Sequence, residues 1–457
     1  MTCIAPWSPE WARPSPAAFD GLAAAGAAAR RDRGEAFAWL FALACALPYP
    51  ALAVGNKTGV QLSHLLALAA APVLALRPPG RSLYALLFLV GPVYVSGFVS
   101  LLRDAAPEAA VIPKEAVSLT LAFCVLWPSG WLAGGRRFRG VMTATAAAIL
   151  GHALVGLYQL HAFSNDEFPL LAAFRNPSFK AMESWSDEYA RYIKRPFGLF
   201  PEPSAMAASL GPFVVVLAGL LADPGAAVRF GLGRKTRALF TAALFAGFLL
   251  LALSRSGLTV AVMAAVLAVS LGSARARFRA AGPWALVAFA ATVAAAGGVV
   301  TYLAVRTGSA LDQRIESSWG LRAISIVTAL TANTDPLDLA FGVGPGQSTP
   351  VVRRLLAGVP KAATQDDMAV WSLVAGYYME HGLVGGAGML ALAVMAGRAV
   401  ARSSAVVLGL GAGAVWLAGV AVTTSYYHLS AVWLFLGLLL HWDRVFLKGP
   451  RAGGAVS

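Results

Sequence analysis

Arginines and acidic residues stand beside apolar runs at several points of this sequence, where they could bind phosphate and move protons. The segment RPFGLFPEP places Arg195 and Glu202 just before an apolar run, and LALSRSGLTV places Arg255 between two such runs. Guanidinium groups bind phosphate oxygens in pairs, and carboxylates are common proton acceptors in catalysis. An arginine at a membrane boundary costs free energy unless it reaches the headgroups or meets an anion, so Arg255 either snorkels or binds an anion.

A third arginine and a run of alternating glycines follow in SSWGLRAISIVTAL and FGVGPGQS. Arg322 lies among apolar residues at helical spacing, which predicts a helix on a membrane surface, and the alternative for its side chain is a solvated helix face. Gly344 and Gly346 let backbone N–H groups converge on an anion. The same glycines also suit a tight turn, and no strand–turn–helix unit surrounds them that would indicate dinucleotide binding.

The chain that positions these residues has the composition of a membrane protein. Of 457 residues, 58% are hydrophobic and only 13% are charged, whereas a soluble domain of this size needs a more polar surface. Apolar runs of about 17 to 25 residues, enough to cross a bilayer, recur along the chain. The sequence predicts an all-α polytopic membrane protein with about 12 transmembrane helices. The predicted spans are 36–55, 61–77, 82–102, 113–132, 140–161, 203–222, 237–253, 256–273, 282–305, 368–397, 404–423 and 428–447.

Basic residues alternate with these spans in a way that orients the chain. The net charge is +14, and the surplus gathers in RRDR, RPPGR, RRFR, RFGLGRKTR, ARARFR and GRAVAR, all on one side of the predicted spans. Cytoplasmic connections of membrane proteins are enriched in lysine and arginine, so these segments and both termini are predicted to be cytoplasmic. The surplus then serves orientation and anionic lipid headgroups, and no nucleic-acid partner is expected.

This topology divides the chain into a tail, a transmembrane domain and a second tail. Residues 1–35 form a cytoplasmic N-terminal tail, because their arginines come directly before a full-length span and do not resemble a cleaved signal peptide. Residues 36–447 form the transmembrane domain, and 448–457 a cytoplasmic C-terminal tail. Two long periplasmic loops, 162–202 and 306–367, are predicted within it, and long loops often carry function.

Chemistry on the outer side would have to draw its energy from an activated substrate. ATP is not available there, and the chain holds no Walker motif. Cys3, Cys45 and Cys124 are far apart and indicate neither a disulfide framework nor a metal pair. We therefore expect no metal site and no cofactor.

The motifs RPFGLFPEPSAMA, LSRSGL, WGLRAISIVTAL…FGVGPGQS and EHGLVG at 380–385 together resemble the O-antigen ligase and polymerase superfamily. They run in that order from about residue 195 to 440. Members of that family are polytopic glycosyltransferases of type C, which join glycans carried on undecaprenyl diphosphate at the outer face of the bacterial inner membrane. The resemblance implies metal-independent transfer, in which arginines matching Arg255 and Arg322 hold the diphosphate of the donor lipid and an acceptor hydroxyl attacks the anomeric carbon.

The resemblance also implies partners and a binding site. The partners would be donor and acceptor glycans linked to undecaprenyl diphosphate, membrane lipids, a chain-length regulator and a flippase. The predicted residues for the diphosphate and sugar are Arg195, Arg255, Arg322, Gly344 and Gly346.

One departure from the family pattern bears on the reaction. Ligases of the family place a His-Asn pair at the start of the helix leading into E-x-G-L-x-G, and here Trp371 stands near that position. Together with PEPS in place of an asparagine-rich version, this favours a polymerase of exopolysaccharide or O-antigen repeat units over a ligase that attaches glycan to lipid A–core. A glycolipid transporter or flippase is the hypothesis from another class, although its two halves should be similar and its charges should lie near mid-bilayer.

The general base is then an open question with two candidates. Asp367 is the first, with Glu202 as the alternative, because carboxylates accept protons readily. Each also has a structural interpretation. Asp367 would cap a helix from residue 368, and Glu202 with Pro203 would open a helix whose dipole favours an acidic residue there.

Overall fold

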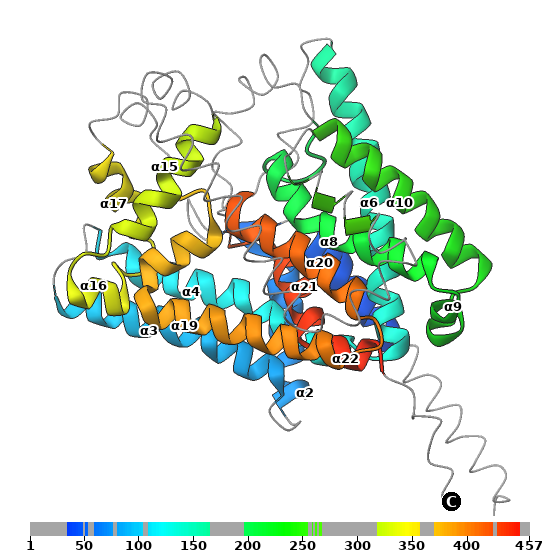
Figure 1. Cartoon of the computed structure of the whole chain (residues 1–457), viewed down its shortest axis with the longest axis horizontal. Coiled ribbons are helices and arrows are strands. Elements are labelled where there is room, and N and C mark those ends of the chain that lie inside the picture. Colours follow the sequence, from blue (N-terminus) through cyan, green and yellow to red (C-terminus); the bar gives the residue numbers. More distant parts are fainter. Residues whose placement is uncertain are drawn as a thin grey trace, which may run out of the picture.

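The described part of the protein is a bundle of apolar helices (Figure 1), to which a two-stranded antiparallel hairpin is added. The structure is a computed structural model that describes residues 34–48, 51–53, 59–75, 80–103, 108–164, 196–254, 258, 261–262, 265–266, 318–356, 370–423 and 427–447. Its first half holds a helix at Gly34–Ala46, then β1 (Ala51–Ala53), β2 (Gly59–Gln61), α2 (Leu62–Ala75), α3 (Arg81–Leu102), α4 (Val111–Phe123), η1 (Cys124–Leu126), α5 (Ser129–Leu132), α6 (Gly135–Ser164), α8 (Pro203–Ala222), α9 (Pro224–Phe230) and α10 (Arg234–Ser254). The second half holds α15 (Ser318–Thr331), α16 (Pro336–Phe341), α17 (Ser348–Leu355), α19 (Leu373–Arg402), α20 (Val406–Ala418), the π-helical turn η5 (Gly419–Thr423), α21 (Ser430–Leu440) and α22 (Trp442–Val445).

Within the part of the chain that the structure describes, six stretches of helix are long and apolar enough to cross a membrane. They are α3, the run Val111–Leu132 through α4 and α5, α6, α8, α10 and α19. Shorter apolar helices, including α2, α20 and α21, contribute to the same bundle, and large apolar side chains such as Phe98, Leu154 and Phe245 remain exposed on its outside. The prediction of an all-α membrane protein is confirmed in this coarse form. The number of twelve spans and the type C fold remain predictions.

Several predicted spans differ from the observed helices by five residues or more: α6 begins five residues before the predicted 140, and α21 ends seven residues before the predicted 447. The span predicted at 36–55 ends as a helix at Ala46, and Ala51–Ala53 instead pairs antiparallel with Gly59–Gln61. The prolines of LPYP explain this, because proline lacks an N–H and disfavours helix in the residue before it. The span predicted at 368–397 begins only at Leu373. The predicted span 282–305 and most of 256–273 lie outside the described residues.

The two ends of the bundle differ in charge. One end, called here the basic end, holds Arg81, Arg136, Arg137, Arg139, Arg229, Arg234, Lys235, Arg237, Arg398, Arg402 and Arg444, with Glu35, Asp223 and Asp443 as its acidic residues. Arg81 there donates two hydrogen bonds of 2.6 and 2.7 Å to Asp443, and Arg139 donates two of 2.8 Å to Glu35. The opposite end, called the acidic end, has a small acidic surplus: it holds Glu108, Glu115, Glu202, Asp335, Asp338 and Glu380 against Arg103, Lys114, Arg353 and Arg354. The asymmetry read along the sequence is therefore found at opposite ends of the folded chain.

The described part of the second predicted loop forms a cap over the acidic end. We use the name cap for residues 318–356, which contain α15, α16 and α17 (yellow in Figure 1). Its apolar side chains and those at the start of α19 form a small second core of Ala329, Val352, Leu356, Val370, Ala375 and Met379. The helix predicted around Arg322 is present as α15.

Candidate functional site

The residues predicted to do chemistry divide into those that the structure describes and those that it does not. Arg195, Arg255 and Asp367 lie outside the described residues, and of Arg322 only the backbone, in α15, is described. Glu202, Gly344 and Gly346 are described. The roles predicted for all of these residues stay predictions.

Glu202 begins α8 at the acidic end with its side chain buried. It is the N-cap residue, in extended conformation, and Pro203 follows at the first helical position. The side chain is 1% exposed, and the Ser204 hydroxyl donates a hydrogen bond to one of its carboxylate oxygens. The helix-opening interpretation is thus confirmed, while no backbone N–H of α8 is bonded to this carboxylate. Glu202 therefore stays the alternative candidate for the general base.

The alternating glycines of FGVGPGQ form a turn that lies directly against α19. The N–H groups of Val343 and Gly344 donate to the carbonyl oxygens of Met379 and Glu380, at 3.0 Å each. The backbones are so close that a Cβ on Gly342 would collide with the Glu380 carbonyl and the His381 nitrogen. The first and second glycines therefore serve a close backbone approach.

The carboxylate of Glu380 occupies the centre of this turn. Ser348 donates to its Oε1 through the hydroxyl at 2.6 Å and through the backbone N–H at 3.4 Å. The N–H of Gly346 donates to the same carboxylate, which is only 4% exposed. The turn is thus an anion-binding arrangement whose anion is a side chain of the protein. The N–H groups of Gly344 and Gly346 are therefore bonded within the chain and do not point at a substrate.

The two residues after Glu380 complete the junction. His381 is fully buried, with Nδ1 2.7 Å from the Ser96 hydroxyl of α3 and Nε2 4.0 Å from the nearer oxygen of Glu380. Gly382 breaks the helical conformation inside α19, with φ 58° and ψ −152°. The motif EHGLVG is therefore the place where α19 kinks and receives the cap.

Residues that the sequence analysis did not select extend this cluster. Glu115 of α4 packs against Gly346, where a Cβ would lie 2.6 Å from its Cγ, and it acts electrostatically on Glu380 and on His428. Ser118 Oγ lies 3.4 Å from Nε2 of His428. Glu115 and Ser118 are three residues apart in a predicted span, so they share one helix face. An ionisable residue near the start of a predicted span, with a polar residue on the same helix face, is the sequence signal that could have identified these two residues.

A buried polar network continues from His428 into the bundle. Gln61 donates to the His428 carbonyl at 2.7 Å, and Ser430 donates to Oε1 of Gln61 at 2.9 Å. The hydroxyls of Ser63 and Ser430 lie 2.7 Å apart. Buried polar groups are costly unless paired, and ionisable groups within membrane proteins often mark functional routes. The network links β2, α2 and α21 to the acidic end.

Charged residues at the end of α3 hold the cap on its other side. Arg103, which caps α3, lies 2.6 Å from Oδ1 of Asp338 and 3.1 Å from Oδ1 of Asp335. The N–H of Leu337 donates to the carboxylate of Asp335, and this bond lowers the pKa of Asp335. The Asp338 N–H and Arg103 lower it further, and together they outweigh the desolvation of the carboxylate, which raises the pKa. Gln347 and Glu108 exchange two hydrogen bonds of 3.0 Å through the Gln347 amide and the Glu108 backbone.

The start of α19 lies a few residues after Asp367. Ser372 is the N-cap residue of α19, and its hydroxyl accepts from the N–H of Ala375 at 3.1 Å. Asp367 lies outside the described residues, so both roles predicted for it stay predictions. Trp371, near the position where the ligases carry histidine, donates its N–H to the Ser325 hydroxyl of α15 at 3.2 Å.

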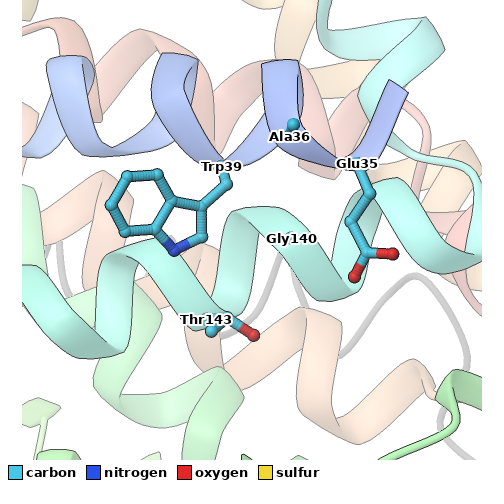
Figure 2. A pocket seen from close by; sticks show the side chains of 5 residues that line it. All are labelled: Glu35, Ala36, Trp39, Gly140 and Thr143. Atoms are coloured by element: carbon cyan, nitrogen blue, oxygen red, sulfur yellow. The ribbon is translucent and has the colours of Figure 1, made fainter. Parts of the chain in front are cut away.

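A surface hollow of about 270 Å³ lies at the other end of the bundle (Figure 2). It is lined by Glu35, Ala36, Trp39, Gly140 and Thr143, and Figure 2 shows the side chains of Glu35 and Trp39 extending from the first helix toward α6. Glu35 is already paired with Arg139 at the basic end. Its described lining contains none of the predicted site residues, and we assign it no role in the reaction.

Substituting Glu380 should destabilise the junction of α19 and the cap. Glu380→Ala leaves the Ser348 hydroxyl and the half-buried N–H groups of Gly346 and Ser348 without this acceptor, at up to about 1–3 kcal/mol for each group that stays unsatisfied. Glu380→Gln keeps one oxygen acceptor, so we expect a smaller loss. Thermal unfolding of the purified protein in detergent measures both. Glu108→Gln, at an exposed side chain of the same end, is the matched control and should leave the melting temperature unchanged. Equal stability of Glu380→Ala and the parent would contradict the assigned role.

Among the described residues, no group of three or more His, Cys, Asp and Glu side chains is placed to hold a metal ion.

Comparisons with other proteins identify no family for this chain. No protein-family model matches the chain, and no curated protein matches it significantly.

Proposed function

We propose that this protein is a glycosyltransferase that polymerises oligosaccharide repeat units linked to undecaprenyl diphosphate into exopolysaccharide or O-antigen. The proposal rests on the contact between two motifs that are separate in the sequence. FGVGPGQS and EHGLVG, both part of the family resemblance, bind each other through the Glu380 carboxylate and through paired backbones. A pattern of short motifs gains weight when the chain folds two of them into one unit at one end of a membrane bundle.

The proposed reaction takes place at the acidic end, on the periplasmic face of a bacterial inner membrane. Lysine and arginine favour the cytoplasmic side, so the basic end would face the cytoplasm with both termini. The twelve-span, type C arrangement belongs to this proposal. The donor and acceptor glycans come from the outer leaflet, after a flippase has delivered them, and a chain-length regulator would set the length of the product.

The residues divide the work by chemistry. Arg255 and Arg322 hold the donor diphosphate, since planar guanidinium groups bind phosphate in pairs and stabilise charge on the leaving group. Arg195 contacts the diphosphate or sugar. Asp367, or alternatively Glu202, accepts the proton of the acceptor hydroxyl as it attacks the anomeric carbon. Transfer needs no metal and no ATP, because cleavage of the sugar–diphosphate bond supplies the free energy.

A ligase that transfers glycan to lipid A–core is the second candidate within the same chemistry. The residue type at position 371 favours the polymerase, because tryptophan has no titratable group where the family resemblance would place the ligase histidine.

Deletion of the gene separates the candidates, because each predicts a different accumulated lipid. For a polymerase, single repeat units should build up on undecaprenyl diphosphate, and long polymer should disappear from gels and from carrier-lipid extracts. Long polymer that still forms on the carrier without reaching lipid A–core would instead identify a ligase. Repeat units confined to the cytoplasmic leaflet would identify a flippase. Complementation with the intact gene is the control for effects on neighbouring genes.

A further inference from the structure

Three positions on one face of α6 contact the segment that leads into α8. His152, Gly156 and Gln159 are four and three residues apart, so they lie on the same side of the helix. They contact residues 196–202, called here the entry segment, which belong to the motif RPFGLFPEP and end at Glu202. His152 and Gln159 are 0% and 7% exposed, and none of the residues assigned to the proposed reaction lies in α6.

Gln159 binds the backbone of the entry segment with both ends of its amide. Its Oε1 accepts from the N–H groups of Phe197 and Gly198, at 3.0 and 2.9 Å. Its Nε2 donates to the carbonyl oxygen of Gly198 at 2.8 Å. Because these groups are buried, breaking the bonds would leave polar atoms without water to replace the partner. Gln159 therefore fixes the backbone at the start of the segment.

His152 binds the next part of the segment. The N–H of Leu199 donates to Nδ1 at 3.0 Å, so the ring carries its proton on Nε2, which donates to the carbonyl oxygen of Ala46 at 2.9 Å. The ring also stacks on that of Phe200, with the centroids 4.7 Å apart. His152 thus joins the end of the first helix, α6 and the entry segment.

Two glycines allow this close approach. Gly198 has φ 58°, and a Cβ there would lie 2.8 Å from Nδ1 of His152. At Gly156 a Cβ would lie 3.3 Å from Pro196, the residue that directly follows Arg195 in the sequence. The entry segment is therefore packed against α6 from its first described residue onward.

We propose that His152 and Gln159 are positioning residues that determine where the two ends of the entry segment, and with them Arg195 and Glu202, lie at the acidic end. The inference rests on the proposed function, which gives Arg195 and Glu202 their roles in binding and proton transfer. His152 and Gln159 themselves touch no substrate. Their bonds reach four backbone groups of the segment, so it cannot shift along α6 without breaking several at once. A displacement of about 1 Å at a reaction site can lower a rate by about 10²-fold.

Two substitutions of His152 separate the bond to the segment from the other contacts of the ring. His152→Asn places an amide oxygen near the position of Nδ1 and keeps an acceptor for Leu199. His152→Gln places its amide near the position of Nε2 and keeps only the bond to the first helix, and both variants lose the aromatic ring. Gln159→Leu removes every bond of the amide at similar size. Leu157→Ala, at an exposed side chain of the same helix, is the control.

The first measurement reports the segment itself and needs no substrate. Leu199→Cys, which keeps the backbone N–H, is made in the full-length chain without its three native cysteines, and a water-soluble maleimide labels it in detergent. Loss of one hydrogen bond should speed labelling about two- to tenfold in His152→Gln, and Gln159→Leu should be labelled faster still. His152→Asn and Leu157→Ala should react at the parent's rate. Melting temperatures identify any variant that does not fold, and the two His152 variants test the proposal without Gln159→Leu.

The second measurement is polymer made in cells that lack the native gene, with the chain keeping Leu199. We expect at least about tenfold less long polymer from His152→Gln and Gln159→Leu at matched protein levels, and rescue by His152→Asn. Equal loss of polymer in His152→Asn and His152→Gln would assign the effect to the ring and overturn the proposal.

Two further results would also overturn it. Unchanged labelling in both His152→Gln and Gln159→Leu would mean that these bonds do not hold the segment. Faster labelling with normal polymer would mean that a displaced segment still supports the reaction. Failure of the proposed function gives a different pattern, in which deletion of the gene leaves polymer unchanged while labelling of the variants still increases; α6 then holds the segment, but not for this reaction.

Discussion

Replacing Gly382 by alanine is expected to detach the cap from α19 and to prevent recovery of folded protein. The residue adopts φ 58° and ψ −152°, a conformation that costs other residues about 1–3 kcal/mol. A Cβ there would lie 2.6 Å from the carbonyl carbon and oxygen of Ala340 and from the nitrogen of Gly342. These are backbone atoms of the cap, which cannot turn aside as a flexible side chain can. Strain and collision therefore act at the same place.

The measurement is the yield of monodisperse protein together with its thermal unfolding and its resistance to limited proteolysis. Gly386→Ala is the matched control, because Gly386 lies in the same helix and a Cβ there would have only an ordinary contact of 3.5 Å with Tyr378. We expect Gly386→Ala to behave as the parent protein. If Gly382→Ala has the stability and protease resistance of the parent, the cap can move away from α19 without loss, and the kink at Gly382 is not required.

Arg255→Ala and Arg322→Ala are each expected to abolish polymer at normal protein levels. Loss of one group that stabilises developing charge typically lowers a rate by about 10²–10³-fold, enough to remove long chains from a gel. Lysine should rescue poorly, because a point charge does not reproduce the planar fork that binds two phosphate oxygens. Polymer length on gels and accumulation of donor lipid, at matched amounts of membrane protein, report the result.

An arginine elsewhere on the cap serves as the control for this experiment. Arg354 is exposed in the last turn of α17, and Arg354→Ala should leave polymer near normal. Full activity with lysine at both 255 and 322 would reduce the two arginines to electrostatic or snorkelling roles. Loss of polymer with both donor lipid and acceptor still bound would point instead to a role after binding.

The apolar pattern of the sequence predicts the membrane helices well where local signals mark their ends. The predicted span 203–222 coincides with α8, because proline suits a first turn, and 82–102 differs from α3 by one residue. At 36–55 the hydrophobic run continues through prolines that stop the helix, so hydrophobicity alone extends the span too far. At α19 the start depends on Ser372, and no apolar boundary marks it.

The candidate site was predictable only in part, because its contacts join distant parts of the chain. Alternating glycines at 342–346 predict either a tight turn or N–H groups around an anion; the structure shows a turn in which the N–H of Gly346 donates to the Glu380 carboxylate. The identity of that anion depends on Glu380, which no local pattern connects to the turn. Glu115 and His428 lie more than 300 residues apart in sequence and meet only in the folded bundle, so spacing could not relate them.

The cap is tied to helices made both before and after it, and this sets an order for its assembly in the cell. Arg103 and Glu108 are synthesised first, so Asp338 of α16 and Gln347 can bind them as soon as residues 335–347 have been made. The turn at 342–348 then waits for Glu380, which follows about ten turns of α-helix later along the chain. Completion of the acidic end is therefore coupled to the late synthesis of α19, and a nascent chain interrupted before residue 373 would leave this junction unfinished.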